Sequence, residues 1–508
     1  MIATRFQMIR GALVLPPDRT QAQALDILVE GDVIREIGPP GVAAPDEATV
    51  IDAAGRLIHA GLVNAHTHAH GALAKAMGDR WSLELLLAAG PWISGNRSLE
   101  DKYLSAALNG AEMVLKGTTA CYDLFFEVPA PTPAGMAAVA DAYRDVGMRA
   151  TIAPMVADRT LYEAIPGLYD ALPDNLKAEV DRFRTQPYAQ TLKGFEDFVR
   201  HHCVDGEHIK IALAPTIPLH CSDEFLCACR DCARRFALGL HSHVAESKVQ
   251  ALAGVRSYGR SLTAHLDRLG MLDAGFTAAH GVWLDEDDMK ILADRGSSVA
   301  HNPASNMRLG SGLADVRAML EAKVNVAVGT DGSNSGDNQN MYEAMKLASF
   351  VSKVRGPDVT SWVTTAEALH AATEGGARAL GFERIGRIAV GFKADLVFLD
   401  LGHINWLPHN HSTNQIVHVE DGGAVRDVMI GGRFVVKDRK LLTLDLAALA
   451  RQAESARNRL AAANAPMKRL AEKLQEAVAS FCVGLARTPY QVERYGAPLR
   501  SWRCDGGG

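Results

Sequence analysis

Two histidines, His66 and His68, stand two residues apart at the end of an apolar segment of this 508-residue chain. Residues two apart in a β-strand share a face, so both imidazoles can point the same way. Such a pair can bind a metal ion, but by itself it is weak evidence, because most histidines are ordinary polar or packing residues. The pair indicates a metal site only if other side chains join it.

Other titratable side chains follow apolar segments in the same manner. Each stands at or just after the end of a short apolar run that is typical of a buried strand: His243 and Glu246, His280, His301, and Asp331. A packed core has no reason to place polar groups so regularly, because an unpaired buried polar group costs free energy. A shared polar centre explains the pattern.

Three imidazoles and one carboxylate are a ligand set that suits Zn²⁺ or Fe²⁺. We assign His66, His68, His243 and Asp331 to one divalent ion, with Zn²⁺ as the first choice and Fe²⁺ as the alternative. A coordination position left for water makes such a site catalytic, because the ion lowers the pKa of that water. His241 shares strand parity with His243 and is the rival ligand. We prefer His243 because it lies closer to the end of its strand.

Three residues are assigned to catalysis: Glu246, His280 and Asp331. Asp331 can both contact the ion and accept the proton of the water. Glu246 follows His243 closely enough to carry a proton to the substrate, and His280 can orient the water or stabilise a developing alkoxide. These roles together describe a hydrolase that activates water.

The elements that must position these residues alternate between apolar strands and amphipathic helices from about residue 60 onward. One helix is expected to start at the capping box Ser98–Asp101 and to stop at Gly117. Eight strands followed mostly by helices predict a (β/α)8 TIM-type barrel over residues 61–384, with chemistry at the carboxyl ends of the strands. The predicted strands are Gly61–His68, Thr118–Leu124, Arg149–Met155, His208–Pro218, Leu238–Val244, Phe276–Leu284, Ser297–Asn302 and Val324–Thr330.

Further elements are predicted outside the barrel. Short strands in residues 1–60 and 385–442 are expected to pair into one small β-sandwich-like domain. Residues 443–508 are expected to form a C-terminal helical extension, built as a helical hairpin with a packing or oligomer surface, and to end in a disordered tail. The segment 157–205 is long for one crossover, which predicts extra helices or a lid.

Composition limits the classes of function. Apolar residues make up 48% of the chain and charged residues 22%, with a formal net charge of −6, as in ordinary globular proteins. This balance argues against nucleic acid as a partner. We find no long apolar run typical of a signal peptide or a transmembrane helix. We therefore expect a cytoplasmic homodimer or higher homo-oligomer that acts on a small molecule and binds neither nucleic acid nor membrane.

Eight cysteines do not make a disulfide framework in a chain of this length. Four of them crowd into Cys221–Cys232, where Cys229 and Cys232 form a single CxxC. A zinc knuckle needs a second pair of ligands at matching spacing, and none follows. We expect reduced thiols on a helix, and an accessory metal or redox site is the alternative.

The motifs around the candidate site resemble the amidohydrolase superfamily, and more narrowly its branch of triazine hydrolases and S-adenosylhomocysteine, guanine and cytosine deaminases. The resemblance covers roughly residues 25–440 and implies a mononuclear site with the four ligands above and with Glu246 and His280 as catalytic partners. Binuclear relatives use a carboxylated lysine on the fourth strand, but Lys210 lies near the start of that strand, so we expect one ion. The matching segments are Gly61–His68, His241–Glu246, Ala279–Leu284, His301–Gly312, Gly329–Gly332 and Gly386–Val397.

The resemblance implies a metal-dependent hydrolytic deaminase of an N-heterocycle such as a purine, pyrimidine, triazine or pterin. Metal-bound hydroxide attacks the amino-bearing ring carbon, Glu246 protonates the neighbouring ring nitrogen, Asp331 receives the proton of the water, and ammonia leaves. The alternative is the same site acting as a triazine chlorohydrolase, an N-alkylamine hydrolase or an amidase. A non-catalytic scaffold is a third hypothesis, against which the presence of every ligand together with Glu246 argues.

Five residues are candidates for binding the substrate. In the loop after the first strand, Trp81 can stack on a planar ring, and Glu84 resembles a ribose-binding acid of nucleoside deaminases. After the seventh strand, His301, Asn302 and Asn306 can donate or accept hydrogen bonds with a heterocycle, or they can shape the turn instead.

Overall fold

The structure is a computed structural model that describes residues 5–183, 185–202 and 204–496. Its centre is an eight-stranded parallel sheet with strands in chain order, and each strand overlaps its predicted segment. The backbone N–H of Asp331 donates to the carbonyl of His66 at 2.9 Å, which brings the last strand back to the first. The predicted barrel is thus confirmed. Its strands are β6 (Leu62–Thr67), β7 (Thr118–Phe125), β8 (Arg149–Val156), β9 (Ile209–Pro215), β10 (Gly239–Val244), β11 (Phe276–His280), β12 (Ser298–His301) and β13 (Asn325–Val328).

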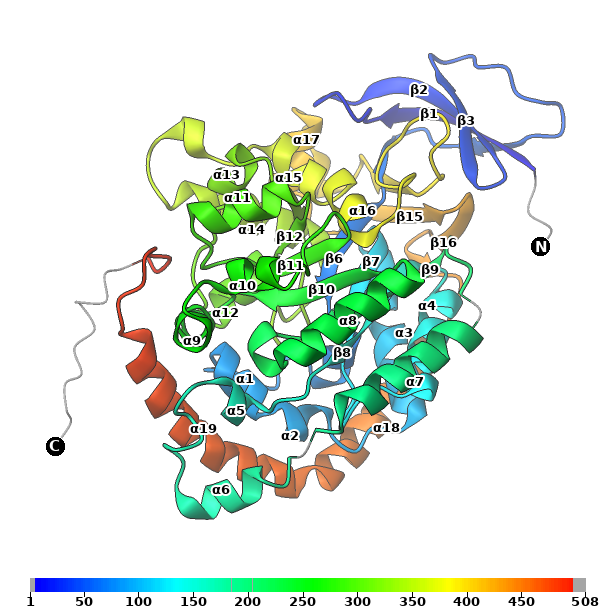
Figure 1. Cartoon of the computed structure of the whole chain (residues 1–508). Helices are drawn as coiled ribbons and strands as arrows, with labels where there is room; N and C mark the ends of the chain where they lie inside the picture. Colours follow the sequence, from blue (N-terminus) through cyan, green and yellow to red (C-terminus); the bar gives the residue numbers. More distant parts are fainter. Residues whose placement is uncertain (1–4, 184, 203, 497–508) are drawn as a thin grey trace.

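Helices surround this sheet (Figure 1). The capping box predicted for α3 is present, because Ser98 and Asp101 each accept a hydrogen bond from the other's backbone N–H. Gly117, with φ of +78°, lets the chain turn away after the helix, as predicted. The helices around the barrel are α3 (Leu99–Leu115), α4 (Pro133–Val146), α7 (Tyr188–His201), α8 (Asp223–Phe236), α9 (Lys248–Tyr258), α10 (Leu262–Arg268), α11 (Glu286–Asp294), α12 (Pro303–Arg308), α13 (Val316–Glu321), α14 (Met341–Lys353), α15 (Thr365–Ala371) and α16 (Glu374–Leu380).

Small side chains fill the inside of the barrel. Leu380 and Phe382, at and after the end of α16, belong to the same buried cluster and close it. The body of the barrel is therefore packed core, and chemistry has room only beyond the strand ends. The small inner residues are Ala65, Ala120, Ala153, Ala212, Ala214, Ala300 and Ala327.

Both chain ends contribute to a second sheet beside the barrel. Its strand order is β17-β16-β15-β14-β5-β1-β2-β3, with β4 next to β1, and antiparallel pairing of Ala60 in β5 with Leu396 in β14 joins the two halves. This shared sheet confirms the predicted β-domain. Its strands are β1 (Phe6–Val14), β2 (Gln23–Glu30), β3 (Val33–Gly38), β4 (Thr49–Asp52), β5 (Arg56–Ala60), β14 (Leu396–Asp400), β15 (Val425–Ile430), β16 (Arg433–Lys437) and β17 (Lys440–Leu441), and α17 (Ser412–His418) lies between β14 and β15.

A buried ion pair joins the two sheets. Arg149 at the start of β8 donates through Nε and Nη2 to the carboxylate of Asp395 at 2.8 and 3.1 Å, and both side chains are 1% exposed. Arg149 also donates to the carbonyl of Glu207, and the backbone N–H of Gly431 donates to Asp395. Both charges are therefore matched by several hydrogen bonds.

Two additions extend the barrel. Within 157–205 the short helices α5 (Leu161–Ala164) and α6 (Asp174–Val180) precede α7. They are the extra helices that the length of this segment predicts. After β17, α18 (Leu446–Ala463) and α19 (Ala465–Ala486) run end to end as one bent arc (Figure 1).

The predicted helical hairpin is therefore wrong, although the helical extension is confirmed. Only Asn464 joins α18 to α19, and its near-helical angles, φ −94° and ψ 3°, do not reverse the chain. An antiparallel hairpin needs a loop of at least two residues. The predicted disordered tail lies outside the described residues.

In the described part of the chain, no helix combines the length and apolarity that crossing a bilayer requires. The thiols of Cys221, Cys227, Cys229 and Cys232 are free and lie on or next to α8, as predicted. Cys203 and Cys504 lie outside the described residues.

The remaining short helices cover loop regions. Two of them, α1 (Leu83–Ala88) and α2 (Gly90–Ser94), follow the first barrel strand, and the 3₁₀ turn η1 (Ala69–Ala74) precedes them. Three further 3₁₀ turns are Pro218–His220, Val359–Ser361 and Ile404–Trp406.

Candidate active site

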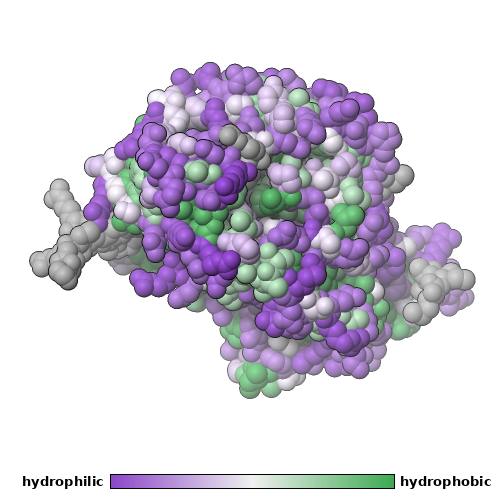
Figure 2. All heavy atoms as spheres, turned by 90° about the horizontal axis from the view of Figure 1, so that it is seen from below, coloured by the Kyte–Doolittle hydropathy of each residue, from purple (hydrophilic) through white to green (hydrophobic). Residues whose placement is uncertain are grey.

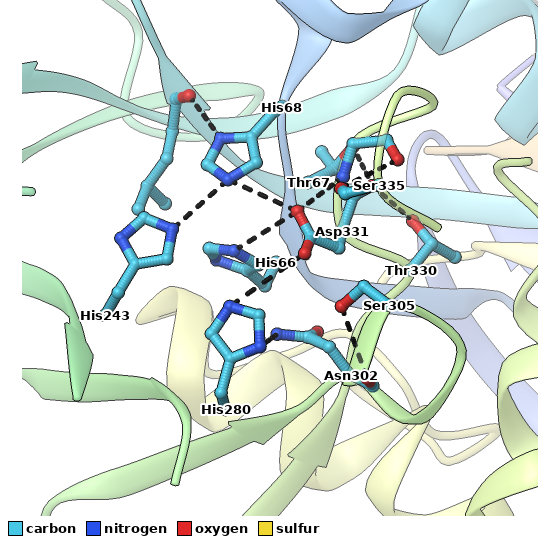
Figure 3. A network of polar contacts seen from close by, with 12 residues as sticks. His66, Thr67, His68, His243, His280, Asn302, Ser305, Thr330, Asp331 and Ser335 are labelled. Carbon is cyan, nitrogen blue, oxygen red and sulfur yellow. Dashed lines mark hydrogen bonds and ion pairs between the residues drawn. The ribbon is translucent and has the colours of Figure 1, made fainter. Parts of the chain in front are cut away.

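Four imidazoles surround the carboxylate of Asp331 at the carboxyl ends of the barrel strands (Figure 3). His68 Nε2 lies 3.3 Å and His66 Nε2 3.8 Å from Asp331 Oδ1, and His280 Nε2 lies 3.9 Å from Asp331 Oδ2. His243 Nε2 lies 3.2 Å from His68 Nε2. Strands β6, β10, β11 and β13 thus bring together residues that are far apart in the sequence.

The cluster has the chemistry of a site for a divalent metal ion. Ligand atoms of His66, His243 and His280 lie within 4.8 Å of one another, and so do those of His66, His68 and Asp331. The Nε2 atoms of His66 and His280 are buried without a hydrogen-bond partner. Buried polar atoms in native proteins nearly always have a partner, so the Nε2 atom of His66 fits a metal-ligand role and that of His280 fits contact with a water molecule or a substrate.

Backbone carbonyls orient two of the imidazoles. His68 Nδ1 lies 2.8 Å from the carbonyl of Leu124, and His243 Nδ1 lies 2.6 Å from the carbonyl of Thr216. A hydrogen bond from Nδ1–H leaves the lone pair of Nε2 free, which is the usual arrangement of metal-binding histidines. Both rings therefore present Nε2 to the centre of the cluster.

Electrostatics favours neutral imidazoles at His66, His243 and His280 and an ionised carboxylate at Asp331. Burial and the neighbouring His68 and His243 lower the pKa of His66 well below its usual range, and burial also lowers the pKa values of His243 and His280. Burial opposes ionisation of Asp331, but attraction by His68 and His280 outweighs it and lowers its pKa. Metal ligands must be deprotonated, and these shifts favour that state.

Backbone irregularities aim the functional side chains. Asp331 and His280 have φ of +61° and +71°, in a region that residues other than glycine rarely occupy. The pairing of β6 with β7 shifts register between Asn64 and Thr67, and such irregularities redirect side chains. Local strain of this kind gathers at functional sites.

Glu246 stands beside this cluster. Its Oε2 lies 3.5 Å from His280 Nε2 and has no hydrogen-bond partner, although the side chain is 1% exposed. Burial, with the nearby charges of Asp331 and Glu84, raises the pKa of Glu246 well above its usual range. A carboxyl group in this state holds a proton that it can donate.

The rival ligand His241 lies behind His66. Its Nε2 is 3.2 Å from His66 Nδ1, and its ring packs against Tyr122 with centroids 4.4 Å apart. Lys210 is at the start of β9, where its Nζ donates to the carbonyl of Gly381 and lies 4.7 Å from the ring centroid of Phe382. The choice of His243 and the expectation of one ion stay predictions.

A cavity of about 660 Å³ opens over the cluster, with His68, His243, Glu246, His280 and Asp331 among its lining residues. Seen from below, the surface is hollowed near its centre, with hydrophobic residues inside the hollow (Figure 2). Most of the wall is apolar, which suits an aromatic ring with apolar substituents. The apolar wall residues include Leu83, Leu86, Leu87, Ile93, Phe126, Val128, Met155, Leu161, Tyr162, Phe183, Ile217, Leu309 and Met467.

None of the five predicted substrate-binding residues lines the cavity within the described ranges. Asn306 Oδ1 and Asn302 Nδ2 lie 2.8 and 3.4 Å from His280 Nδ1, and His301 is buried nearby. Glu84 accepts hydrogen bonds from Ser82 and Ser247. Trp81 packs edge-on against Trp92. Contact of these five with a substrate stays a prediction, and this placement does not favour it.

Apart from the predicted ligands and catalytic residues, sequence reasoning did not identify the residues that line the cavity. His70 lines it, with a buried Nδ1 that has no partner, and Met467 reaches it from α19. The only sequence signal for α19 is its apolar stripe, which indicates a buried face without naming what covers it.

Comparison with known proteins adds to this picture. The profile of the amidohydrolase family matches residues 57–435. The 5'-deoxyadenosine deaminase of Methanosarcina mazei is 32% identical over 451 residues, which cover 89% of this chain and 96% of that protein. The zinc-bound crystal structure of an adenosine deaminase from Xanthomonas campestris is 29% identical, covers 89% of this chain and 98% of its own, and has a TM-score of 0.77.

A triazine hydrolase of Arthrobacter aurescens has the same fold, with a TM-score of 0.79, 22% identity, and coverage of 89% of this chain and 99% of its own. At this identity the likeness concerns the fold alone. The similarity in sequence lies with the deaminases.

Proposed function

The chain belongs to the amidohydrolase family, and from this premise we propose that its site removes the amino group of an aromatic N-heterocycle by hydrolysis, as a metal-dependent deaminase. One observation carries the assignment. Glu246, a buried carboxyl group with a raised pKa and a free Oε2, lies at the cavity beside His280 and Asp331. Hydrolysis at an amino-bearing ring carbon needs a proton donor and a proton acceptor on either side of that carbon.

The residues divide the proton transfers between them. Asp331, ionised and in contact range of His66 and His68, accepts the proton of the attacking water. Glu246 donates its proton to the ring nitrogen next to the reacting carbon. His280, 3.5 Å from Glu246 and 3.9 Å from Asp331, orients the water between them. Asp331 then passes the proton that it accepted to the amino nitrogen, the carbon–nitrogen bond breaks and ammonia leaves. The new hydroxyl group gives its proton to Glu246 and becomes the carbonyl of the product.

His66, His68, His243 and Asp331 would bind the divalent ion, which lowers the pKa of a water molecule and so supplies a nucleophile near neutral pH. We propose Zn²⁺ as this ion. The zinc in the related adenosine deaminase and the imidazole-rich donor set support that choice.

For the substrate we propose an adenine nucleoside without a charged 5' group. The related 5'-deoxyadenosine deaminase and the apolar wall of the cavity support it. A cytoplasmic location and a homo-oligomeric state remain proposals that stand on composition alone.

Ammonia release from a panel of adenine nucleosides, pyrimidines, triazines and pterins, measured beside the metal content, tests the proposal. We expect one bound divalent ion per chain and fastest release from an adenine nucleoside. A metal-loaded protein that releases ammonia from none of these compounds would contradict the function.

One feature favours a second candidate, displacement of another leaving group from a triazine. Besides Glu246 and Asp331, the only carboxylate lining the cavity in the described part of the chain is Glu127, and it is paired with Lys102. Among the described lining residues, no carboxylate outside the catalytic pair is thus free to accept hydrogen bonds from the hydroxyl groups of a ribose. Chloride or alkylamine release from triazines in the same panel separates the two candidates.

A further inference from the structure

The C-terminal helix α19 lies beyond residue 435, where the match to the amidohydrolase family ends. Nevertheless Met467, in its first turn, lines the same cavity as Glu246 and Asp331. We propose that α19 is part of the substrate pocket and limits the size of the apolar substituent that the substrate ring can carry. The proposal rests on the proposed function, because it concerns the same cavity.

Polar contacts hold α19 against the two short helices of the cavity wall. Gln475 Nε2 donates to the carbonyl of Leu85 in α1 at 3.0 Å, and Asn464 Nδ2 donates to the carbonyl of Gly95 after α2 at 3.0 Å. The ammonium group of Lys468 lies 5.6 Å from the ring centroid of Trp92. Contacts at three places along its length determine where α19 lies relative to α1 and α2.

The apolar stripe of α19 packs on the outer side of the wall. Its buried residues Leu474, Val478 and Leu485 belong to one apolar cluster. The same cluster contains Leu161 and Tyr162 of α5, which line the cavity. The apolar face of α19 and this part of the wall are thus packed in one cluster, so α19 limits how far the wall can move outward.

The chemistry of this wall determines what it accepts. The residues that α1, α2 and α5 contribute to it are apolar or nearly so, with leucines predominating, and Met467 adds a flexible thioether. An alkyl or thioalkyl substituent gains free energy by contact with such a surface, at roughly 0.8 kcal/mol per buried methylene. A zwitterionic substituent would instead lose hydration against this apolar surface.

Because α19 also packs near the helix that follows Glu246, the test must separate pocket size from catalysis. Val249 and Leu252 of α9 belong to the same apolar cluster, and Gln250 accepts a hydrogen bond from the backbone N–H of Glu246 at 2.9 Å. A disturbance passed on through α9 would affect every substrate alike. A steric effect of Met467 would affect only substrates with a long substituent.

The experiment compares Met467→Trp with wild type on 5'-deoxyadenosine and on its 5'-hexylthio derivative. We expect kcat/KM for the hexylthio compound to fall at least about tenfold more than kcat/KM for 5'-deoxyadenosine, mainly through KM. The control is Val483→Trp, which adds the same ring on an exposed position of α19 that does not line the cavity. This control should leave the ratio of the two kcat/KM values unchanged.

A second variant, Met467→Ala, enlarges the pocket. It should raise kcat/KM for the hexylthio compound relative to kcat/KM for 5'-deoxyadenosine, so the proposal can still be tested if the tryptophan variant fails to fold. A ratio that neither substitution at Met467 moves overturns the proposal. If wild type releases no ammonia from any ring, the proposed function fails instead. In that case, calorimetry measures the Kd of each nucleoside for the same variants and tests the role of α19. We expect Met467→Trp to weaken binding of the hexylthio compound more than binding of 5'-deoxyadenosine. An unchanged ratio of the two Kd values would contradict the proposal.

Discussion

At the amino end of the barrel, Arg149 and Asp395 are as deeply buried as Glu246 and His280 are at the carboxyl end, but their surroundings differ. The first pair satisfies its charges with two mutual hydrogen bonds and with backbone groups of Glu207 and Gly431. In the second pair, Glu246 Oε2 and His280 Nε2 have no hydrogen-bond partner among the described residues. Removing one partner of a matched buried charge pair destabilises the fold, whereas buried polar atoms without a partner are typical of a site that binds a ligand.

The largest effect that this comparison predicts is loss of the ion. His68→Ala removes a proposed ligand, so bound metal should fall below about a tenth of an equivalent and turnover should fall to background. Metal analysis and ammonia release measure it. As the control, His220→Ala changes another cavity histidine that is outside the proposed ligand set and should keep its metal. An unchanged metal content in His68→Ala would disprove the ligand assignment.

Removal of the proton donor should have the next largest effect. Glu246→Gln keeps the shape of the side chain but not its proton, so turnover should fall by about 10²–10⁴-fold while metal content stays near that of wild type. Steady-state kinetics and metal analysis on one preparation check both parts. The exposed Glu224→Gln serves as control and should match wild type. Normal turnover in Glu246→Gln would show that another residue donates the proton.

At the other end of the barrel, the predicted loss is one of stability. Arg149→Ala leaves Asp395 buried and unpaired, so the free energy of unfolding should fall by about 3–5 kcal/mol. Turnover per folded, metal-loaded chain should stay within about twofold. Denaturant unfolding measures the first quantity. Arg457→Ala, which breaks the exposed pair with Glu454, should cost less than about 1 kcal/mol. A similar cost for both variants would break the comparison.

The smallest effect concerns the support of His280. Asn306→Ala removes the amide oxygen 2.8 Å from His280 Nδ1, so the ring loses one orienting contact. We expect kcat to fall roughly two- to tenfold, as one net hydrogen bond of about 0.5–1.5 kcal/mol implies, with metal content unchanged. The exposed Asn414→Ala is the control. An increase in KM with kcat unchanged would indicate that Asn306 contacts the substrate after all.

The residues of the polar centre could be predicted from the sequence because each of them stands at or just after the end of an apolar strand. The two-residue period of a strand and the position at its end restrict where such a side chain can point. Strand parity suggested that His66 and His68 share a face, but it did not reveal the register shift between Asn64 and Thr67. The pattern of residue types also could not predict the left-handed backbone conformation of His280 and Asp331.

The cavity wall was out of reach for a different reason. Leu86, Tyr162 and Met467 line one cavity although they come from three segments that are distant in the chain. No local period encodes such contacts, because each stripe shows only that a face is buried. The hairpin prediction failed similarly, since a single joining residue, Asn464, decides whether two helices reverse or continue.

The pairing of β5 with β14 has a consequence for how the chain is made. Ala60 and Leu396 face each other in that ladder although about 336 residues separate them. At ribosomal rates of about 5–20 residues per second, β5 is synthesised roughly 17–67 s before its partner. Through that interval the amino-terminal strands hold an open edge, which other chains can pair with. The step that completes the β-domain therefore comes after the barrel strands have been synthesised, and it also ends the period in which nascent chains can associate through this edge.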